Sequence, residues 1–119
     1  MELNEYQEKA MTTCMASSNN FSYMFLNLVG EVGEFASKVA KSIRKDIAYI
    51  GLNDLKYDKE NDAQMNKEEL KKEAGDVLWQ LSGLCSVMGW SLNDIAQQNL
   101  DKLASRQQRN VIEGNGDNR

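Results

Sequence analysis

The sequence contains no histidine and no proline, and it has only two cysteines, Cys14 and Cys85. Without histidine, the usual zinc sites, the histidine-containing di-iron bundles and the histidine-based catalytic triads are excluded. The absence of proline leaves no residue that must interrupt a helix. Both cysteines lie among apolar residues at helical spacing, so we interpret them as buried thiols. Any chemistry must therefore rest on carboxylates, lysines, arginines or hydroxyl groups.

Positive charge is also scarce. The 18 acidic and 14 basic side chains give a net charge of −4, which does not indicate a nucleic-acid-binding surface. Hydrophobic residues make up 41% of the 119 residues, a balance typical of one globular domain. No apolar run is long enough to span a bilayer, and the first residues are not typical of a secretory signal. We expect one cytoplasmic domain over residues 1–119, with neither membrane nor nucleic acid as a partner.

Apolar residues recur at intervals of three and four, which predicts an all-α fold of four to five helices. The expected helices cover residues 4–16, 22–45, 66–88 and 91–110. Asn66 with Glu69 three residues later is typical of a capping box, and Gly89 is typical of the residue that follows a helix. We expect residues 46–65 to form a long connecting loop and residues 111–119 to form an irregular tail.

Two pairs of acidic residues stand out on the second and third expected helices: Glu31 with Glu34, and Glu73 with Asp76. Residues three apart span about 60° of a helix, so both members of a pair point the same way. Both pairs border apolar stripes, and antiparallel packing of the stripes would bring the four carboxylates together. Mg²⁺, or Mn²⁺, would relieve their mutual repulsion. The alternative is a solvated helix face, on which Glu34 pairs with Lys38.

Three glycines strengthen the functional interpretation. Gly30, Gly33 and Gly75 lie inside the expected helices, directly beside the acidic residues. Each costs about 1 kcal/mol relative to alanine in a helix interior. We interpret them as positions where space beside the carboxylates is kept open.

The strings Gly-Glu-Val-Gly-Glu (30–34) and Glu-Ala-Gly-Asp-Val-Leu-Trp (73–79) resemble the Glu-x-x-Glu and Glu-x-x-Asp signature of MazG-like nucleotide pyrophosphohydrolases. These proteins belong to the all-α nucleoside triphosphate pyrophosphatases. Residues 3–7, 99–106 and 114–119 resemble further sequence blocks of the same family. The stretch between the two acidic pairs is longer than the usual spacing in the family.

The resemblance implies hydrolysis of a (deoxy)nucleoside triphosphate to the monophosphate and pyrophosphate, as part of nucleotide-pool housecleaning. It implies that Glu31, Glu34, Glu73 and Asp76 bind magnesium, and that Glu31 or Glu34 activates the attacking water. It also implies a homodimer or homotetramer with sites near the subunit contacts. The preferred base and sugar stay open.

The residues expected to bind substrate lie mainly on the fourth expected helix. Asn99, Lys102 and Arg106 share one face of it by their spacing, and the resemblance implies that this face meets the triphosphate. The further candidates are Lys38, Trp79, Asp117 and Arg119. Lys38 and Arg119 suit phosphate contacts, while Trp79 suits stacking on a base or packing in the core.

The alternative function is a non-catalytic helical module that binds a nucleotide or another protein. The joint presence of the four acidic residues and the Asn99, Lys102 and Arg106 face argues against it.

Overall fold

The computed structural model describes residues 1–117. The elements in chain order are α1 (Leu3–Met11), the short 3₁₀ helix η1 (Ala16–Ser18), α2 (Phe21–Arg44), β1 (Ala48–Ile50), β2 (Leu55–Tyr57), α3 (Glu60–Val87) and α4 (Leu92–Gln108). The all-α fold predicted from the sequence is confirmed in part, since the structure is mostly helical but also contains a two-stranded sheet. None of the helices in the described part of the chain combines the length and the apolar character needed to cross a membrane.

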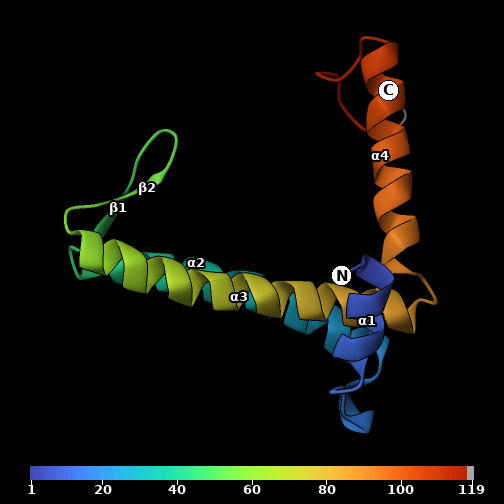
Figure 1. Ribbon diagram of the computed structural model, residues 1–119, viewed down its shortest axis with the longest axis horizontal. Coiled ribbons are helices and arrows are strands. Elements are labelled where there is room, and N and C mark those ends of the chain that lie inside the picture. The colour runs from blue at the N-terminus through green and yellow to red at the C-terminus, as the bar shows by residue number, and fades with distance from the viewer. Residues whose placement is uncertain (118–119) are drawn as a thin grey trace.

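The body of the protein is the pair of long helices α2 and α3, which lie side by side and run antiparallel (Figure 1). Asn20 begins α2, because its side chain accepts a hydrogen bond from the backbone N–H of Tyr23 at 2.9 Å. The two helices approach closely where the fully buried Met24 meets Gly83. A Cβ added to Gly83 would lie 2.3 Å from the sulfur of Met24, so a larger residue at position 83 would force the buried Met24 side chain to move.

Much of the expected 46–65 loop is ordered secondary structure. β1 and β2 form an antiparallel hairpin, and α3 begins at Glu60. Asn66 is therefore not the N-cap of the third helix. It lies buried inside α3, where its amide donates to Ser42 Oγ at 2.7 Å and accepts from the hydroxyl of Tyr57. These partners come from α2 and β2, so the local capping pattern gave the wrong start of the helix.

α1 lies across the C-terminal end of α3 and holds the turn that leads into α4. Gln7 is buried, and its amide nitrogen donates to Ser86 Oγ at 3.0 Å and to the carbonyl of Trp90 at 2.9 Å. Its amide oxygen accepts from the backbone N–H of Leu92 at 2.9 Å. One side chain thus joins α1, the end of α3 and the start of α4, and it fixes the direction in which α4 leaves.

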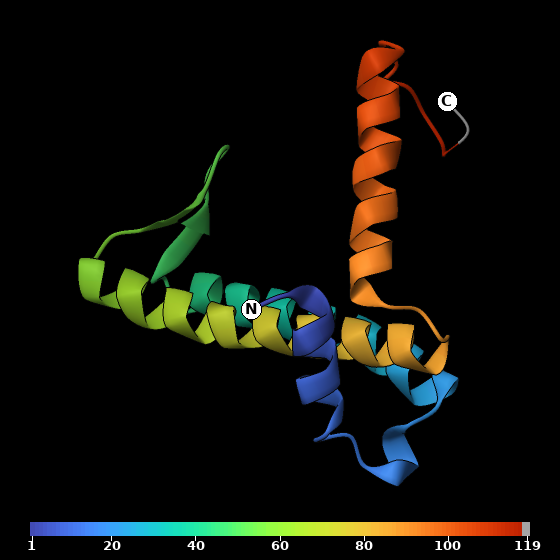
Figure 2. The ribbon, with the colours of Figure 1, turned by 45° about the vertical axis from the view of Figure 1, so that its right-hand side comes forward.

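α4 projects steeply away from the helical pair (Figures 1 and 2). Ser91 caps it as predicted, accepting from the N–H of Asp94 at 3.1 Å. The helix makes its main contact with α1, near its own start. The radius of gyration is 17.7 Å, whereas a compact chain of this length has about 13.5 Å. The single chain is therefore more open than the predicted four- to five-helix bundle, because α4 lies apart from the helical pair.

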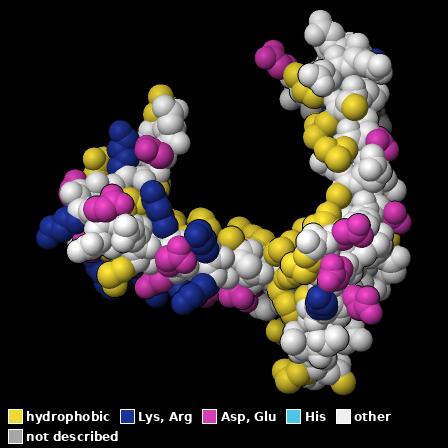
Figure 3. All heavy atoms as spheres, in the orientation of Figure 1, with side chains coloured by type: hydrophobic (Ala, Val, Ile, Leu, Met, Phe, Trp, Pro, Cys, Tyr) yellow, Lys and Arg dark blue, Asp and Glu magenta, His cyan; other side chains and the backbone are white. Residues whose placement is uncertain are grey.

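Large apolar side chains remain on the surface. On α2, Val29 and Val32 are 61% and 52% exposed, on the side that α3 does not cover. Figure 3 shows hydrophobic side chains gathered on the inner side of the angle between the helical pair and α4. Monomeric proteins rarely expose a continuous apolar surface of this kind.

Candidate active site

Three carboxylates meet on one side of the α2–α3 pair. Glu31 from α2 and Glu73 and Asp76 from α3 each offer an oxygen, and these oxygens lie within 4.8 Å of one another. Antiparallel packing places the two short sequence motifs opposite each other, as the spacing predicted. Glu73 is buried and Asp76 is exposed, so the cluster is anchored in the helical pair and open to solvent.

Negative charges crowd together in the cluster. Burial raises the pKa of Glu31 above its ordinary value, and nearby carboxylates raise it further. In decreasing order, these carboxylates are Asp76, Glu73 and Glu34. A bound cation would relieve this repulsion. Because all the donors are carboxylate oxygens, the group fits a hard divalent metal ion.

Glu34, the fourth acidic residue predicted for the metal site, lies beside the cluster. It is exposed and stands outside the group of three carboxylates. Its charge nevertheless acts on the carboxyl of Glu31. The structure therefore brings three predicted ligands together and leaves Glu34 on the solvent side.

Lys38 supplies a positive charge next to the cluster. Its ammonium nitrogen lies 3.0 Å from an oxygen of Glu73. The sequence suggested Glu34 as the ion-pair partner of Lys38, but the structure pairs Lys38 across the two helices. The hydrogen bond to Glu73 is the main reason why the pKa of Lys38 is raised.

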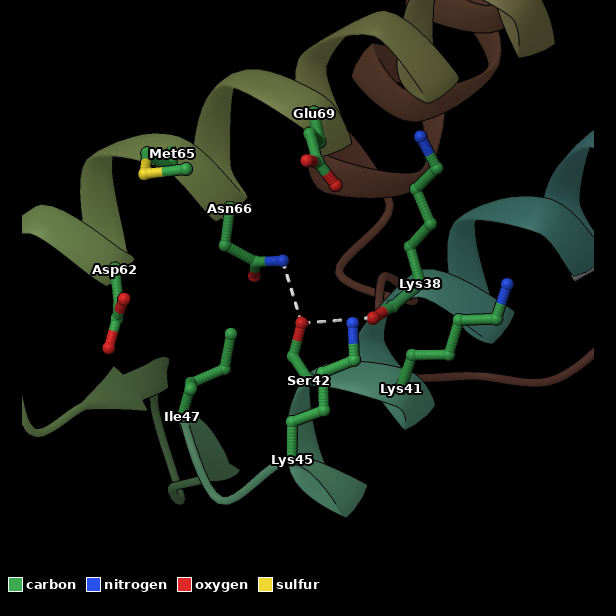
Figure 4. Close-up of a pocket in the computed structure, with 9 residues that line it drawn as sticks. All are labelled: Lys38, Lys41, Ser42, Lys45, Ile47, Asp62, Met65, Asn66 and Glu69. Carbon is green, nitrogen blue, oxygen red and sulfur yellow. Dashed lines mark hydrogen bonds between the residues drawn. The ribbon is translucent and has the colours of Figure 1, made fainter.

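A polar hollow of about 310 Å³ continues from Lys38 along the helical pair (Figure 4). Its lining comprises Lys38, Lys41, Ser42, Lys45, Ile47, Asp62, Met65, Asn66 and Glu69. The lysines come from α2, whereas Asp62 and Glu69 come from α3. The hydrogen bond between Asn66 and Ser42 crosses from one helix to the other here. Lys38, which pairs with Glu73, lies between the hollow and the carboxylate cluster.

The predicted substrate face on α4 carries two cations that share one carboxylate. Lys102 Nζ and Arg106 Nη2 each lie 3.0 Å from Oδ1 of Asp117. Asn99 and Lys102 also line a hollow of about 270 Å³ on α4. This face lies apart from the carboxylate cluster, because α4 projects away from α2 and α3 (Figure 2). One copy of the chain therefore does not bring the two predicted halves of the site together.

The tail folds back along α4. Arg106 Nη2 also donates to the carbonyl of Gly116 at 3.3 Å. Hydrogen bonds from Lys102 and Arg106 lower the pKa of Asp117. Gly116 has a φ of +79°, a conformation that favours glycine. Arg119, predicted to contact substrate, lies outside the described residues.

Trp79, a candidate to stack on a base, has a structural contact. Its indole N–H donates to the carbonyl of Ala10 at 3.1 Å and to Thr13 Oγ1 at 3.0 Å. These bonds hold the end of α1 against α3. Of the two roles considered from the sequence, stacking on a base or packing in the core, the second is closer to this arrangement.

Two polar residues near the cluster were not singled out from the sequence. Tyr6 on α1 lies close enough to Asp76 for that carboxylate to help raise the pKa of the phenol, after the larger effect of burial. Gln80, one turn beyond Asp76, is 2% exposed, and its amide oxygen has no hydrogen-bond partner among residues 1–117. No local spacing identifies either residue, because packing between helices places both.

The fold and the cluster define a mostly helical protein with a candidate carboxylate metal centre. A family profile described as "MazG nucleotide pyrophosphohydrolase domain" matches residues 19–111. The match includes both acidic pairs and the whole of α4, and it leaves α1 outside. The chain belongs to the MazG nucleotide pyrophosphohydrolase domain family.

Two curated relatives are similar to the chain. The "Gene 37 protein" of Mycobacterium phage L5 is 39% identical over 103 residues, covering 87% of this chain and 80% of that protein. The "Uncharacterized protein YvdC" of Bacillus subtilis (strain 168) is 33% identical over 78 residues, covering 66% and 71%. No solved structure matches the chain.

Proposed function

We propose that the protein hydrolyses a (deoxy)nucleoside triphosphate to the nucleoside monophosphate and pyrophosphate in a reaction that requires Mg²⁺. The observation that carries the proposal is the convergence of Glu31, Glu73 and Asp76 to within 4.8 Å. Membership of the MazG domain family supports the same reaction class. Water adds to phosphorus and the bond between the α- and β-phosphates breaks, so pyrophosphate is the leaving group.

Each acidic residue has a role that follows from its position. Glu31, Glu73 and Asp76 would hold Mg²⁺, or Mn²⁺ in its place. The bound metal would supply polarisation of a phosphoryl oxygen and a lowered pKa for a bound water. Glu34, exposed beside the cluster, would orient or deprotonate the attacking water. Glu31 is the other candidate for that role.

The α4 face would complete the site from a second copy of the chain. Three observations support a homodimer or homotetramer: the exposed apolar side of α2, the large radius of gyration and the separation of α4 from the helical pair. In such an assembly, Asn99, Lys102 and Arg106 of one copy would lie over the carboxylates of another. Positive charge would then meet the triphosphate opposite the metal, which stabilises charge as it develops.

The test is release of pyrophosphate from a panel of nucleoside triphosphates, with the monophosphate quantified alongside. We expect turnover with Mg²⁺ or Mn²⁺ and none in excess EDTA. Turnover that persists in EDTA would contradict the metal-dependent mechanism. Orthophosphate as the only inorganic product would contradict the assigned bond cleavage. Tight nucleotide binding without turnover would favour the non-catalytic binding module.

A further inference from the structure

The tail places the negative charge of Asp117 on two cations that the proposed substrate would bind through its phosphates. Oδ1 of Asp117 accepts hydrogen bonds from Lys102 Nζ and Arg106 Nη2, both at 3.0 Å. The carboxylate side chain itself is largely exposed. Lys102 and Arg106 belong to the face predicted to meet phosphate. The single negative charge of Asp117 therefore already offsets part of their positive charge inside the free protein.

Asp117 does not use the full capacity of Arg106. The guanidinium side chain is buried, with the residue only 4% exposed. Its Nε has no hydrogen-bond partner within residues 1–117. Arginine binds phosphate most strongly through two parallel N–H donors. The contact seen here leaves such a donor unpaired, so a phosphate could bind Arg106 more completely than Asp117 does.

The two sides of the Asp117 contact differ in exposure. The carboxylate faces solvent, so it regains water when it leaves the two cations. The guanidinium of Arg106 is buried, and a buried charge left without a partner is costly, so Asp117 leaves readily only when another anion takes its place. The segment before Asp117 contains two glycines, Gly114 and Gly116, which give the backbone freedom to move.

We propose that Asp117 is an internal substitute for a substrate phosphate, held on Lys102 and Arg106 until the phosphates of the nucleotide displace it. The proposal rests on the proposed function for the identity of the anion as a polyphosphate. Displacement exchanges one carboxylate for a phosphate that can engage both Nη2 and Nε of Arg106. Lys102 and Arg106 thus exchange the carboxylate for a phosphate and have an anionic partner before and after binding.

The experiment measures binding of inorganic pyrophosphate to the full chain by calorimetry in EDTA, so that neither metal nor turnover is involved. Asp117→Asn removes the competing charge and preserves the shape of the side chain. We expect it to bind pyrophosphate about three- to fivefold more tightly than the unmodified protein, the range expected for losing one exposed ionic competitor. Asp101→Asn is the matched control. Asp101 is an exposed aspartate on α4 that accepts from Gln97, and its replacement should leave the affinity unchanged.

Unchanged or weaker pyrophosphate binding by Asp117→Asn would overturn the proposal, because the carboxylate would then be a structural latch or a positioning group. Equal tightening in Asp101→Asn would also overturn it, since a general charge effect would explain the result. Absence of pyrophosphate binding in both proteins would overturn it as well. Tighter binding by Asp117→Asn together with no turnover of any nucleotide would uphold this proposal and contradict the proposed function.

Discussion

At the scale of single residues, the environment of each carboxylate distinguishes it from its neighbours. Glu73 is buried and paired with Lys38, Glu31 is half-buried among like charges, and Asp76 and Glu34 are exposed. The same chemical group therefore has a different capacity to bind a cation at each position. The sequence spacing predicted that four carboxylates come together, whereas three of them do and Glu34 lies outside the group. The spacing also did not show that Glu73 is paired with Lys38.

Replacing Asp76 with alanine should lower kcat by about 100-fold or more, because one of three converging ligands is lost. The fold should persist, since removing one of several repelling carboxylates does not destabilise the metal-free protein. Steady-state pyrophosphate release and far-ultraviolet circular dichroism measure the two effects. Glu68→Ala, an exposed carboxylate on the same helix paired with Lys71, should leave kcat unchanged. An unfolded Asp76→Ala protein would make the residue structural and refute the site assignment.

The raised pKa of Glu31 predicts a pH dependence of stability in the metal-free protein. The folded state binds the proton of Glu31 more tightly than the unfolded state does, because burial and Asp76 raise that pKa. This contribution to stability is fully present below the unfolded pKa, and it is lost as the pH rises through the raised folded pKa. Glu31→Gln should abolish this loss of stability with rising pH. Melting temperatures of both proteins, measured in EDTA between about pH 4 and pH 7, test this expectation. Melting temperatures that change with pH in the same way in both proteins would contradict it.

Metal binding should show the opposite pH trend. The ligands bind a cation only as carboxylates, so Mn²⁺ affinity should fall as acid protonates Glu31. The raised pKa of Glu31 moves this loss to a higher pH than an ordinary glutamate would give. Electron paramagnetic resonance of free Mn²⁺ measures the affinity directly. An affinity that is constant down to the pKa of an ordinary glutamate would remove Glu31 from the ligand set.

At the scale of the elements, local sequence patterns predicted where helices form, but not which other elements the helices contact. The serine cap at Ser91 and the left-handed residue Gly89 are where the sequence placed them, since both are local features. The start of α3 was wrong because Asn66 bonds to Ser42 and Tyr57, which are distant in the chain. The hairpin was read as loop because each of its strands has three residues, too few to show an alternating pattern.

The candidate site divides in the same way. Short-range spacing placed Glu31, Glu73 and Asp76 on facing sides of two helices, and the structure brings them together. The contacts of Tyr6 and Lys38 depend on how helices pack, so no spacing rule could reveal them. The parts of the site outside the acidic motif are therefore determined by tertiary packing.

Gln7→Ala should destabilise the protein by about 2 kcal/mol, because it leaves buried polar partners at the α3–α4 turn unsatisfied. Urea unfolding followed by circular dichroism measures the change in the free energy of unfolding. The exposed Gln64 on α3 provides the control, and Gln64→Ala should change stability by less than about 0.5 kcal/mol. Equal effects of the two substitutions would show that Gln7 does not stabilise the turn.

At the scale of the whole molecule, the single chain buries few apolar side chains. Within the described residues, the buried hydrophobic residues are Met24, Ala48, Ala63, Leu70, Cys85 and Leu92. The extended shape follows from this small core and from the outward direction of α4. Composition predicted a globular domain, but it could not show that the apolar residues would be divided between an internal core and an open face.

Val32→Asp should dissociate the proposed homo-oligomer, because a charge would be buried in the contact between copies. Sedimentation velocity measures the oligomeric state, and activity should fall with it if α4 of a second copy completes the site. Leu52→Asp at the hairpin tip, where Leu52 is 98% exposed, is the control and should leave the assembly unchanged. An unmodified protein that is active as a monomer would contradict the shared site.

The buried amide of Gln7 lies at the turn from which the long helix α4 projects. Arg106 lies 14 residues after Leu92, or about 21 Å along the helix axis. A tilt of about 5° at the turn would therefore displace Arg106 by about 2 Å, and displacements near 1 Å already slow reactions that depend on aligned groups. In the proposed assembly, the accuracy with which the α4 cations would reach a phosphate in another copy would thus be set at the far end of the helix, by the hydrogen bonds of Gln7.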